Sequence, residues 1–469
     1  MTTISHDESR TVVEPPAPPR PGAGEPRPYH FPTFESRTLN NGLRVIVAPV
    51  TKLPVVSVVA VIDAGAGTEP PGRDGVALLT ARALLEGSAT RDGAALIDDA
   101  ERLGGALDAS ADWDAATVQF TVLSERIAPA LRLMADVMRT PAFPEHDIAR
   151  LKSERQAELL QLRAEPRGLA DEMIERFVYS PNARYARPDG GSAASVEALT
   201  RAHVDAFYHA RYRPDAVTLI VVGNVTTSEI EGLAEEVFGG WAGQAPAPSD
   251  TVLDTAAGDP PTVRIVRKAD APQSEIRVGH VGLPRGHRDY FPALIMNAIL
   301  GGLFSSRINL NLREVHAYTY GARSTYDWRR GAGPFVVQTA VQSDVTDAAL
   351  REILTEITRI RAEPVQASEL SLATSYLDGV FPIRYETASA IATALANLVI
   401  YGLPADFYDE YRARVRAVSA VDVLTAARTH LDPTRLQVVI VGDPEAVRVP
   451  LEGVGAGPVL VYDETGRPL

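Results

Sequence analysis

The chain has 469 residues, of which 45% are hydrophobic and 23% charged, and its formal net charge is -14. Since domains usually run to roughly 100–200 residues, this length predicts two to four of them. The negative charge argues against a general binder of nucleic acid or of anionic membranes, because both depend on clustered Lys and Arg. The chain has no cysteine, which excludes disulfides, thiolate metal sites and Cys nucleophiles.

Residues 1–33 are rich in proline and predict an extended, disordered arm, because proline fixes φ and lacks an amide donor. The segment has no basic start followed by an apolar stretch. No later stretch approaches the roughly 20 apolar residues that a membrane span requires. We therefore expect no membrane association and a cytoplasmic location.

The rest of the chain reads as two similar parts, 34–241 and 263–469, joined by a Pro/Gly/Ser/Ala-rich linker at 242–262. The stretch VEALTRAHVDAFYHARYRPDAVTLIVVGNV recurs in pattern as VRAVSAVDVLTAARTHLDPTRLQVVIVGDP, at a constant offset of 219 and without a gap. Each copy predicts a helix opened by a hydroxyl side chain, a turn at proline and a β-branched strand that ends in glycine. These positions are Thr200, Pro214 and Gly223 in the first copy and Ser419, Pro433 and Gly442 in the second.

Earlier segments repeat at nearly the same offset, since PVVSVVAVIDAG from Pro54 corresponds to PQSEIRVGHVGL from Pro272. Any helix-turn-strand unit can look alike, but duplication accounts for both matches. Strands alternate with amphipathic helices such as DAALREILTEITRIRAE. We predict an α+β protein of two homologous halves, each an antiparallel-rich sheet faced by helices.

Local motifs for catalysis are missing from the sequence. It contains no phosphate-binding loop and no Gly-x-Ser-x-Gly elbow, and GGSAAS near Ser192 predicts a turn and a helix cap. None of the nine histidines is paired at the i, i+4 spacing that directs two imidazoles at one metal. Surface or core roles are favoured for all of them.

A resemblance supplies what local motifs do not. LNNGLRVIVAP, IDAGAGTEPPGRDGVALL, LGGALDASADWDAATVQFTVLSE and LRLMADVMRTPAFPEHDIARLKSER occur in the order typical of one family. The chain resembles the inverzincin zinc peptidases, of the pitrilysin, insulinase and mitochondrial processing peptidase type. The resemblance implies that the two halves form half of a clam-shaped peptidase chamber.

The family's zinc motif, His-x-x-Glu-His, does not survive in this chain. Its positions fall on Leu78, Ala81 and Arg82, which offer no metal ligand and no general base. The family's third ligand corresponds to Glu158, which is retained. We predict that no metal binds here and that Arg82 pairs with Glu158, one fixed charge holding two helices together; the alternative is an Arg82 that extends to solvent.

The second half keeps the family's other functional stretch, NAILGGLFSSRINLNLREVHAYTYGARSTY. The resemblance places Arg313 at a helix end and Tyr320 at the start of a strand, both facing the scissile peptide. The glycine-containing loop of Gly301, Gly302, Phe304 and Ser305 would let a peptide backbone approach closely. Arg313 could instead satisfy terminal helix carbonyls, and Tyr318 competes with Tyr320 for the second position.

By this resemblance, a lost zinc motif together with the retained Arg313 and Tyr320 implies a non-catalytic, substrate-binding subunit of a heterodimeric zinc metallopeptidase that cleaves unfolded peptides. Arg313 and Tyr320 would support the active site of a partner that carries His-x-x-Glu-His and the zinc, whereas this chain would hold no cofactor. Its acidic balance could favour basic peptides. The alternative is a scaffold subunit similar to the core proteins of a respiratory complex, and a self-sufficient peptidase with another metal site has little support.

Overall fold

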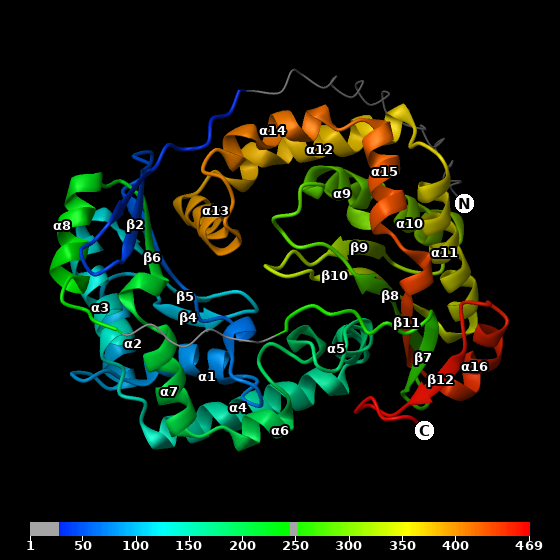
Figure 1. The fold of residues 1–469 in the computed structure, drawn as a ribbon, viewed down its shortest axis with the longest axis horizontal. Helices are drawn as coiled ribbons and strands as arrows, with labels where there is room; N and C mark the ends of the chain where they lie inside the picture. The colour runs from blue at the N-terminus through cyan, green and yellow to red at the C-terminus, as the bar shows by residue number, and fades with distance from the viewer. Residues whose placement is uncertain (1–27, 244–251) are drawn as a thin grey trace, which may run out of the picture.

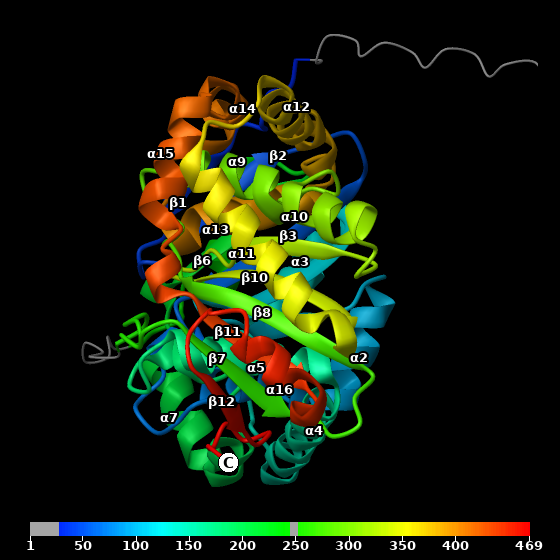
Figure 2. The same ribbon diagram turned by 90° about the vertical axis from the view of Figure 1, so that its right-hand side faces the viewer.

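The computed structural model describes residues 28–243 and 252–469, which form two mixed sheets, each covered by helices (Figures 1 and 2). The strands of the first sheet are β1 (Glu35–Thr38), β2 (Arg44–Pro49), β3 (Val55–Ile62), β4 (Asp108–Ala111), β5 (Ala116–Leu123) and β6 (Val217–Gly223). Those of the second are β7 (Thr262–Arg267), β8 (Gln273–Val281), β9 (Ala322–Tyr326), β10 (Pro334–Gln342), β11 (Gln437–Gly442) and β12 (Val459–Tyr462).

The two sheets share one topology over five of their six strands. Their orders are β1-β2-β6-β3-β5-β4 and β12-β7-β11-β8-β10-β9. In the first sheet, β6 pairs parallel with β2 and antiparallel with β3. In the second sheet, β11 pairs parallel with β7 and antiparallel with β8. The sixth strand differs, because β1 precedes β2 and pairs antiparallel, whereas β12 comes from the end of the chain and pairs parallel with β7. The predicted α+β class with two homologous, antiparallel-rich halves is confirmed.

The helices of the first half are α1 (Val76–Ala83), α2 (Gly93–Arg102), α3 (Ile127–Arg139), α4 (Glu145–Ala164), α5 (Pro166–Val178), α6 (Ala193–Ala198), α7 (Arg201–Arg211) and α8 (Thr227–Phe238). The second half has α9 (Tyr290–Asn297), η6 (Ala298–Gly302), α10 (Arg307–Asn309), η7 (Leu310–Val315), α11 (Thr346–Ala362), α12 (Ala367–Arg384), α13 (Ala388–Tyr401), α14 (Phe407–Ala417), α15 (Ala420–His430) and α16 (Pro444–Glu452). Thr200 and Ser419 cap α7 and α15 as predicted, each through its side-chain oxygen. Ser192 likewise caps α6.

The halves are interlocked, because each contributes a helix to the other's sheet. Helix α5 of the first half lies on β8 and β11, and α13 of the second half lies on β3 and β6 (Figure 1). On the second sheet, Leu169 and Met173 of α5 are fully buried in one cluster with Val439 and Val441 of β11. Apolar area of both halves is therefore removed from water only when they are together.

The end of the predicted disordered arm is ordered, which corrects that expectation for residues 28–33. Phe31 is 4% exposed and stacks on Tyr408 of α14, with ring centres 4.8 Å apart. The Tyr29 hydroxyl donates a hydrogen bond to the Tyr385 carbonyl at 2.8 Å. Aromatic burial here outweighs the tendency of a proline-rich segment to stay extended. The remainder of the arm, residues 1–27, and residues 244–251 of the predicted linker lie outside the described part of the chain.

The segment Tyr290–Val315 is long and apolar enough to cross a membrane by length and composition, although a turn at 303–306 separates α9 and η6 from α10 and η7. The expectation that no stretch approaches such a length was therefore wrong on length and composition. The segment is a core element, because 61% of its apolar window is buried within the protein and Leu300 and Leu312 are fully covered.

Candidate functional site

The start of α1 is fixed by a buried carboxylate. Glu69 Oε1 accepts hydrogen bonds from the N–H groups of Gly75 and Ala77, both at 2.9 Å. Its Oε2 accepts from Nε and Nη2 of the buried Arg184 at 3.0 and 2.7 Å. Burial raises the pKa of Glu69 to about 7, against the lowering effect of the Arg184 charge and the backbone donor. Gly75 adopts φ +95°, and an added Cβ would lie 2.8 Å from the Gly190 carbonyl oxygen, so the tight turn into α1 requires glycine.

Arg82 of α1 pairs with Glu158 of α4, as predicted. Its Nη1 and Nη2 donate to the two carboxylate oxygens at 2.8 and 3.2 Å, a two-pronged contact. Arg155 adds a second guanidinium, 3.1 Å from Glu158 Oε2, and also donates to the Gly190 carbonyl at 3.1 Å. Partial burial acts to raise the pKa of Glu158, but hydrogen bonds from Arg82 and Arg155 outweigh it and the pKa is lowered. Glu158 therefore serves as an ionised link between two arginines.

The same geometry does not fit the zinc of the resembled family. Leu78 and Ala81 carry no donor atoms, and two guanidinium groups already surround the one carboxylate. Leu78, Arg82, Arg155 and Gly190 line a cavity of only about 10 Å³, roughly the space of one water molecule. A metal cation here would meet fixed positive charge and one available ligand.

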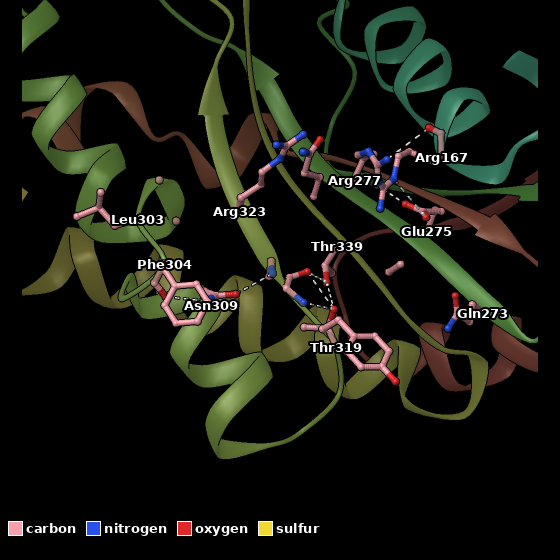
Figure 3. A pocket seen from close by; sticks show the side chains of 17 residues that line it. Arg167, Gln273, Glu275, Arg277, Leu303, Phe304, Asn309, Thr319, Arg323 and Thr339 are labelled. Atoms are coloured by element: carbon pink, nitrogen blue, oxygen red, sulfur yellow. Dashed lines mark hydrogen bonds and ion pairs between the residues drawn. The ribbon is translucent and has the colours of Figure 1, made fainter. Parts of the chain in front are cut away.

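The second half carries a much larger cavity, of about 670 Å³ (Figure 3). It lies on the inner face of the second sheet, which is the face that α5 also covers. Four residues that the sequence singled out line it: Gly301, Gly302, Phe304 and Tyr320. Tyr320 is 96% exposed and Phe304 is 68% exposed, so both present aromatic surface to solvent at the cavity. The cavity therefore brings together most of the predicted peptide-contacting residues.

Arg313 and Ser305 are not among the residues that line this cavity. The Arg313 guanidinium instead lies 4.6 Å from the ring centre of Phe304, within range of a cation–π contact. Arg313 thus reaches the cavity through Phe304, and a role as a positioning residue fits better than direct contact.

One local expectation needs correction. Tyr320 does not begin a strand, because β9 starts two residues later at Ala322. Gly301 is buried against that strand, and an added Cβ would lie 2.5 Å from Ser324 N, so helix–strand packing by itself requires glycine at this position. Tyr318 stacks on His316 with ring centres 5.0 Å apart and does not line the cavity, which leaves Tyr320 as the cavity tyrosine.

Asn309 joins the two sides of the cavity mouth. Its Nδ2 donates to the Phe304 carbonyl at 2.6 Å, and its Oδ1 accepts from Ala322 N at 3.0 Å. The loop that presents Phe304 and the strand that follows Tyr320 are therefore held in one arrangement.

A polar row across the sheet was missed in the sequence. Arg323 of β9, Gln338 of β10 and Arg277 of β8 are direct cross-strand neighbours, and all three line the cavity (Figure 3). Arg277 is compensated by Asp171 of α5 at 2.6 Å and by Glu275 at 2.9 Å. Arg323 has no ion pair among the residues that the structure describes, and the Gln338 side-chain oxygen, in the amide orientation that satisfies both groups, accepts from its guanidinium. The two-residue alternation of β9 and β10 places these side chains on one face, but the pairing between the strands does not follow from local sequence.

The fold and the altered zinc position define a peptidase-like protein of two homologous halves. Residues 44–186 match the family model described as Insulinase (Peptidase family M16), and residues 198–377 match the model described as Peptidase M16 inactive domain. Together these matches cover more than half of the chain, which belongs to the M16 peptidase family.

Individual relatives agree with this assignment. The chain is 21% identical over 353 residues to an uncharacterized zinc protease of Bacillus subtilis, YmxG, covering 75% of this chain and 85% of that one. It is 26% identical over 281 residues to a probable mitochondrial-processing peptidase subunit beta of Schizosaccharomyces pombe, covering 58% and 59%. A crystal structure of a peptidase M16 inactive domain from Pseudomonas fluorescens shares the fold, with a TM-score of 0.81, 24% identity and coverage of 87% of this chain and 98% of that one.

Proposed function

We propose that this chain is the non-catalytic, substrate-binding subunit of a heterodimeric zinc metallopeptidase. The observation that carries the proposal is the cavity with its exposed Tyr320, in a chain whose first half holds Arg82 where zinc would require a ligand. A partner subunit with His-x-x-Glu-His would supply the zinc and the catalytic base. The substrate is an unfolded peptide, with no part for nucleic acid or membrane.

Residues of this chain would bind and orient the peptide. Strand β9 is the edge of the second sheet, so its outer side can accept a further strand through main-chain hydrogen bonds. The Tyr320 phenol, two residues before that edge, can donate a hydrogen bond to a substrate carbonyl or to the oxyanion formed in the partner's site. Phe304 offers an apolar face, which the Arg313 guanidinium holds in place.

The cavity lining favours acidic segments rather than the basic ones suggested by net charge. Arg167, Arg277 and Arg323 line it with only one carboxylate, that of Glu275. Arg277 pairs with Asp171 and Glu275, and Arg167 lies 4.0 Å from Glu275. Among the described residues, Arg323 is therefore the cavity arginine without a carboxylate partner, and its charge is left for a ligand. A carboxylate on the peptide can accept two hydrogen bonds from such a group. The charge next to the cavity decides which peptides it attracts, because salt screens the more distant acidic residues that make the net charge negative.

The test begins with mild affinity purification of the tagged chain from its native host. We expect a companion of similar size that bears His-x-x-Glu-His, and chelator-sensitive cleavage of peptides that the pure chain lacks. In the reconstituted pair, Tyr320→Phe should lower turnover by about 100- to 1,000-fold without changing zinc content, as expected for loss of one oxyanion donor. Tyr318→Phe, a matched change in the same loop that lies off the cavity, should leave turnover unchanged. Absence of a companion and of cleavage would favour a scaffold subunit instead.

A further inference from the structure

Three potential metal ligands meet far from both sites described above. His287 lies in the loop that follows β8, Asp289 is the residue before α9, and His430 is the last residue of α15. Among the residues that the structure describes, these three form the one group of at least three His, Asp or Glu side chains spaced to hold a metal ion. We propose that they bind a zinc ion, independently of the function proposed above.

The distances between the donor atoms already bracket those of a zinc site. His430 Nε2 lies 2.9 Å from Asp289 Oδ2, and His287 Nδ1 lies 4.0 Å from the same oxygen. With metal–ligand bonds of about 2 Å in a tetrahedron, ligand atoms lie about 3.3 Å apart. Small side-chain rotations that shift the donor atoms by a few tenths of an ångström to about one ångström would therefore place all three around a common centre.

The two imidazole rings have a matching arrangement. Their centres are 5.2 Å apart and their planes meet at 83°. Two imidazoles on one tetrahedral zinc also have ring centres about 5 Å apart, because each nitrogen lies about 2 Å from the metal. Nδ1 of His287 is the unprotonated nitrogen of its ring, since it accepts a hydrogen bond from the N–H of Asp289 at 3.1 Å. Zinc would displace that contact and the proton that His430 Nε2 shares with Asp289.

The neighbourhood allows an ion to enter. The side chains of His287 and Asp289 are 29% and 34% exposed, whereas that of His430 is 9% exposed and anchors the group. Arg288 is the nearby competing cation, with Nε 3.7 Å from Asp289 Oδ1, but its side chain is 90% exposed and can turn into solvent. Two nitrogens and one oxygen leave a fourth position for water, and this donor set suits zinc.

A bound ion would connect the end of α15 to the start of α9. The helical run that begins with α9 continues through η6 to Gly302, which lines the cavity. Zinc would therefore hold the start of the helical segment whose other end lines the proposed peptide site. It would also stabilise the native chain, because it would bind the folded chain in preference to the unfolded one.

The test is zinc titration by calorimetry on the untagged full-length chain after removal of metal, with metal content measured after gel filtration. We expect one zinc per chain and a melting temperature that rises with zinc. His287→Ala, His430→Ala and Asp289→Asn should each weaken binding at least tenfold. His209→Ala is the matched control, because its Nδ1 lies 3.6 Å from Asp205 without a second histidine, and it should change nothing.

Circular dichroism of the metal-free variants separates loss of a ligand from loss of the fold. If His430→Ala unfolds, His287→Ala and Asp289→Asn still test whether these side chains bind zinc, because His287 and Asp289 are the more exposed members of the group. No saturable zinc binding by the parent chain, or binding that His287→Ala and Asp289→Asn leave unchanged, would overturn the proposal.

Discussion

At the residue scale, the ion pair of Arg82 and Glu158, which occupies the position of the family's zinc site, is an interhelical contact of modest strength. The side chains of Arg82 and Glu158 are 31% and 43% exposed, so solvent screens their attraction and Arg82→Met should cost only ~0.2–1 kcal/mol of unfolding free energy. Glu158→Gln should cost more, because it leaves Arg82 and Arg155 facing each other without a counter-charge. Urea unfolding of both variants at low and high salt measures the difference, and equal losses in the two variants would contradict this account.

Asp114, in the turn between β4 and β5, predicts a specific pH dependence. Its Oδ2 accepts a hydrogen bond from Arg330 N at 2.9 Å, which joins the two halves. Burial raises the pKa of Asp114 to about 6, above its ordinary value of 3.8. Because the folded pKa is raised, the group's contribution to stability is full below pH 3.8 and is lost as pH rises through 6.

Asp114→Asn should therefore remove this loss while keeping an acceptor for Arg330 N. We expect the stability of the variant relative to the parent to increase by ~1–2 kcal/mol between about pH 4.5 and pH 7.5, because each pKa unit is worth about 1.4 kcal/mol. Denaturant unfolding at the two pH values measures the change. A difference between variant and parent that does not vary with pH would show that folding does not raise the pKa of Asp114.

At the scale of elements, helix α5 is the contact by which the first half covers the second sheet. Leu169→Ala should lower the unfolding free energy by ~2–5 kcal/mol, since the side chain is fully buried against β11 and leaves a cavity. Leu160→Ala on the neighbouring α4 is the matched control, because Leu160 is 74% exposed, and its effect should stay within about 0.5 kcal/mol. Chemical denaturation compares the two, and similar losses would mean that α5 does not hold the halves together.

Elements whose signals are local could be predicted from the sequence, whereas elements that depend on tertiary contacts could not. The cap at Thr200, the turn at Pro214 and the strand up to Gly223 each follow from side-chain chemistry at short range, and the structure confirms them. The row of Arg323, Gln338 and Arg277 depends on strand pairing, and the meeting of His287 with His430 depends on the packing of α9 against α15. No pattern within either segment encodes such long-range neighbours.

At the scale of the whole molecule, duplication predicted two similar halves but not how they are joined. Each half of a duplicated chain is expected to bury its own sheet, yet α5 and α13 each cover the sheet of the other half. Phe31 adds a third crossing, because it precedes the first sheet and is buried against α14 of the second half. These exchanges keep the inner face of the second sheet at a fixed position relative to the first half, which the proposed peptide site requires.

This interlocking makes a prediction for fragments 28–243 and 252–469. Expressed alone, each fragment would expose the apolar sheet face that the other fragment's helix covers, so each should aggregate or remain partly unfolded. Expressed together, the fragments should copurify as an equimolar complex with the circular dichroism of the intact chain, because the interface resembles a continuous core. Leu169→Ala in the first fragment should weaken that association, whereas Leu160→Ala should not. Two fragments that are each monodisperse and cooperatively folded alone would contradict the prediction, since exchange of helices would then contribute little to the stability of either half.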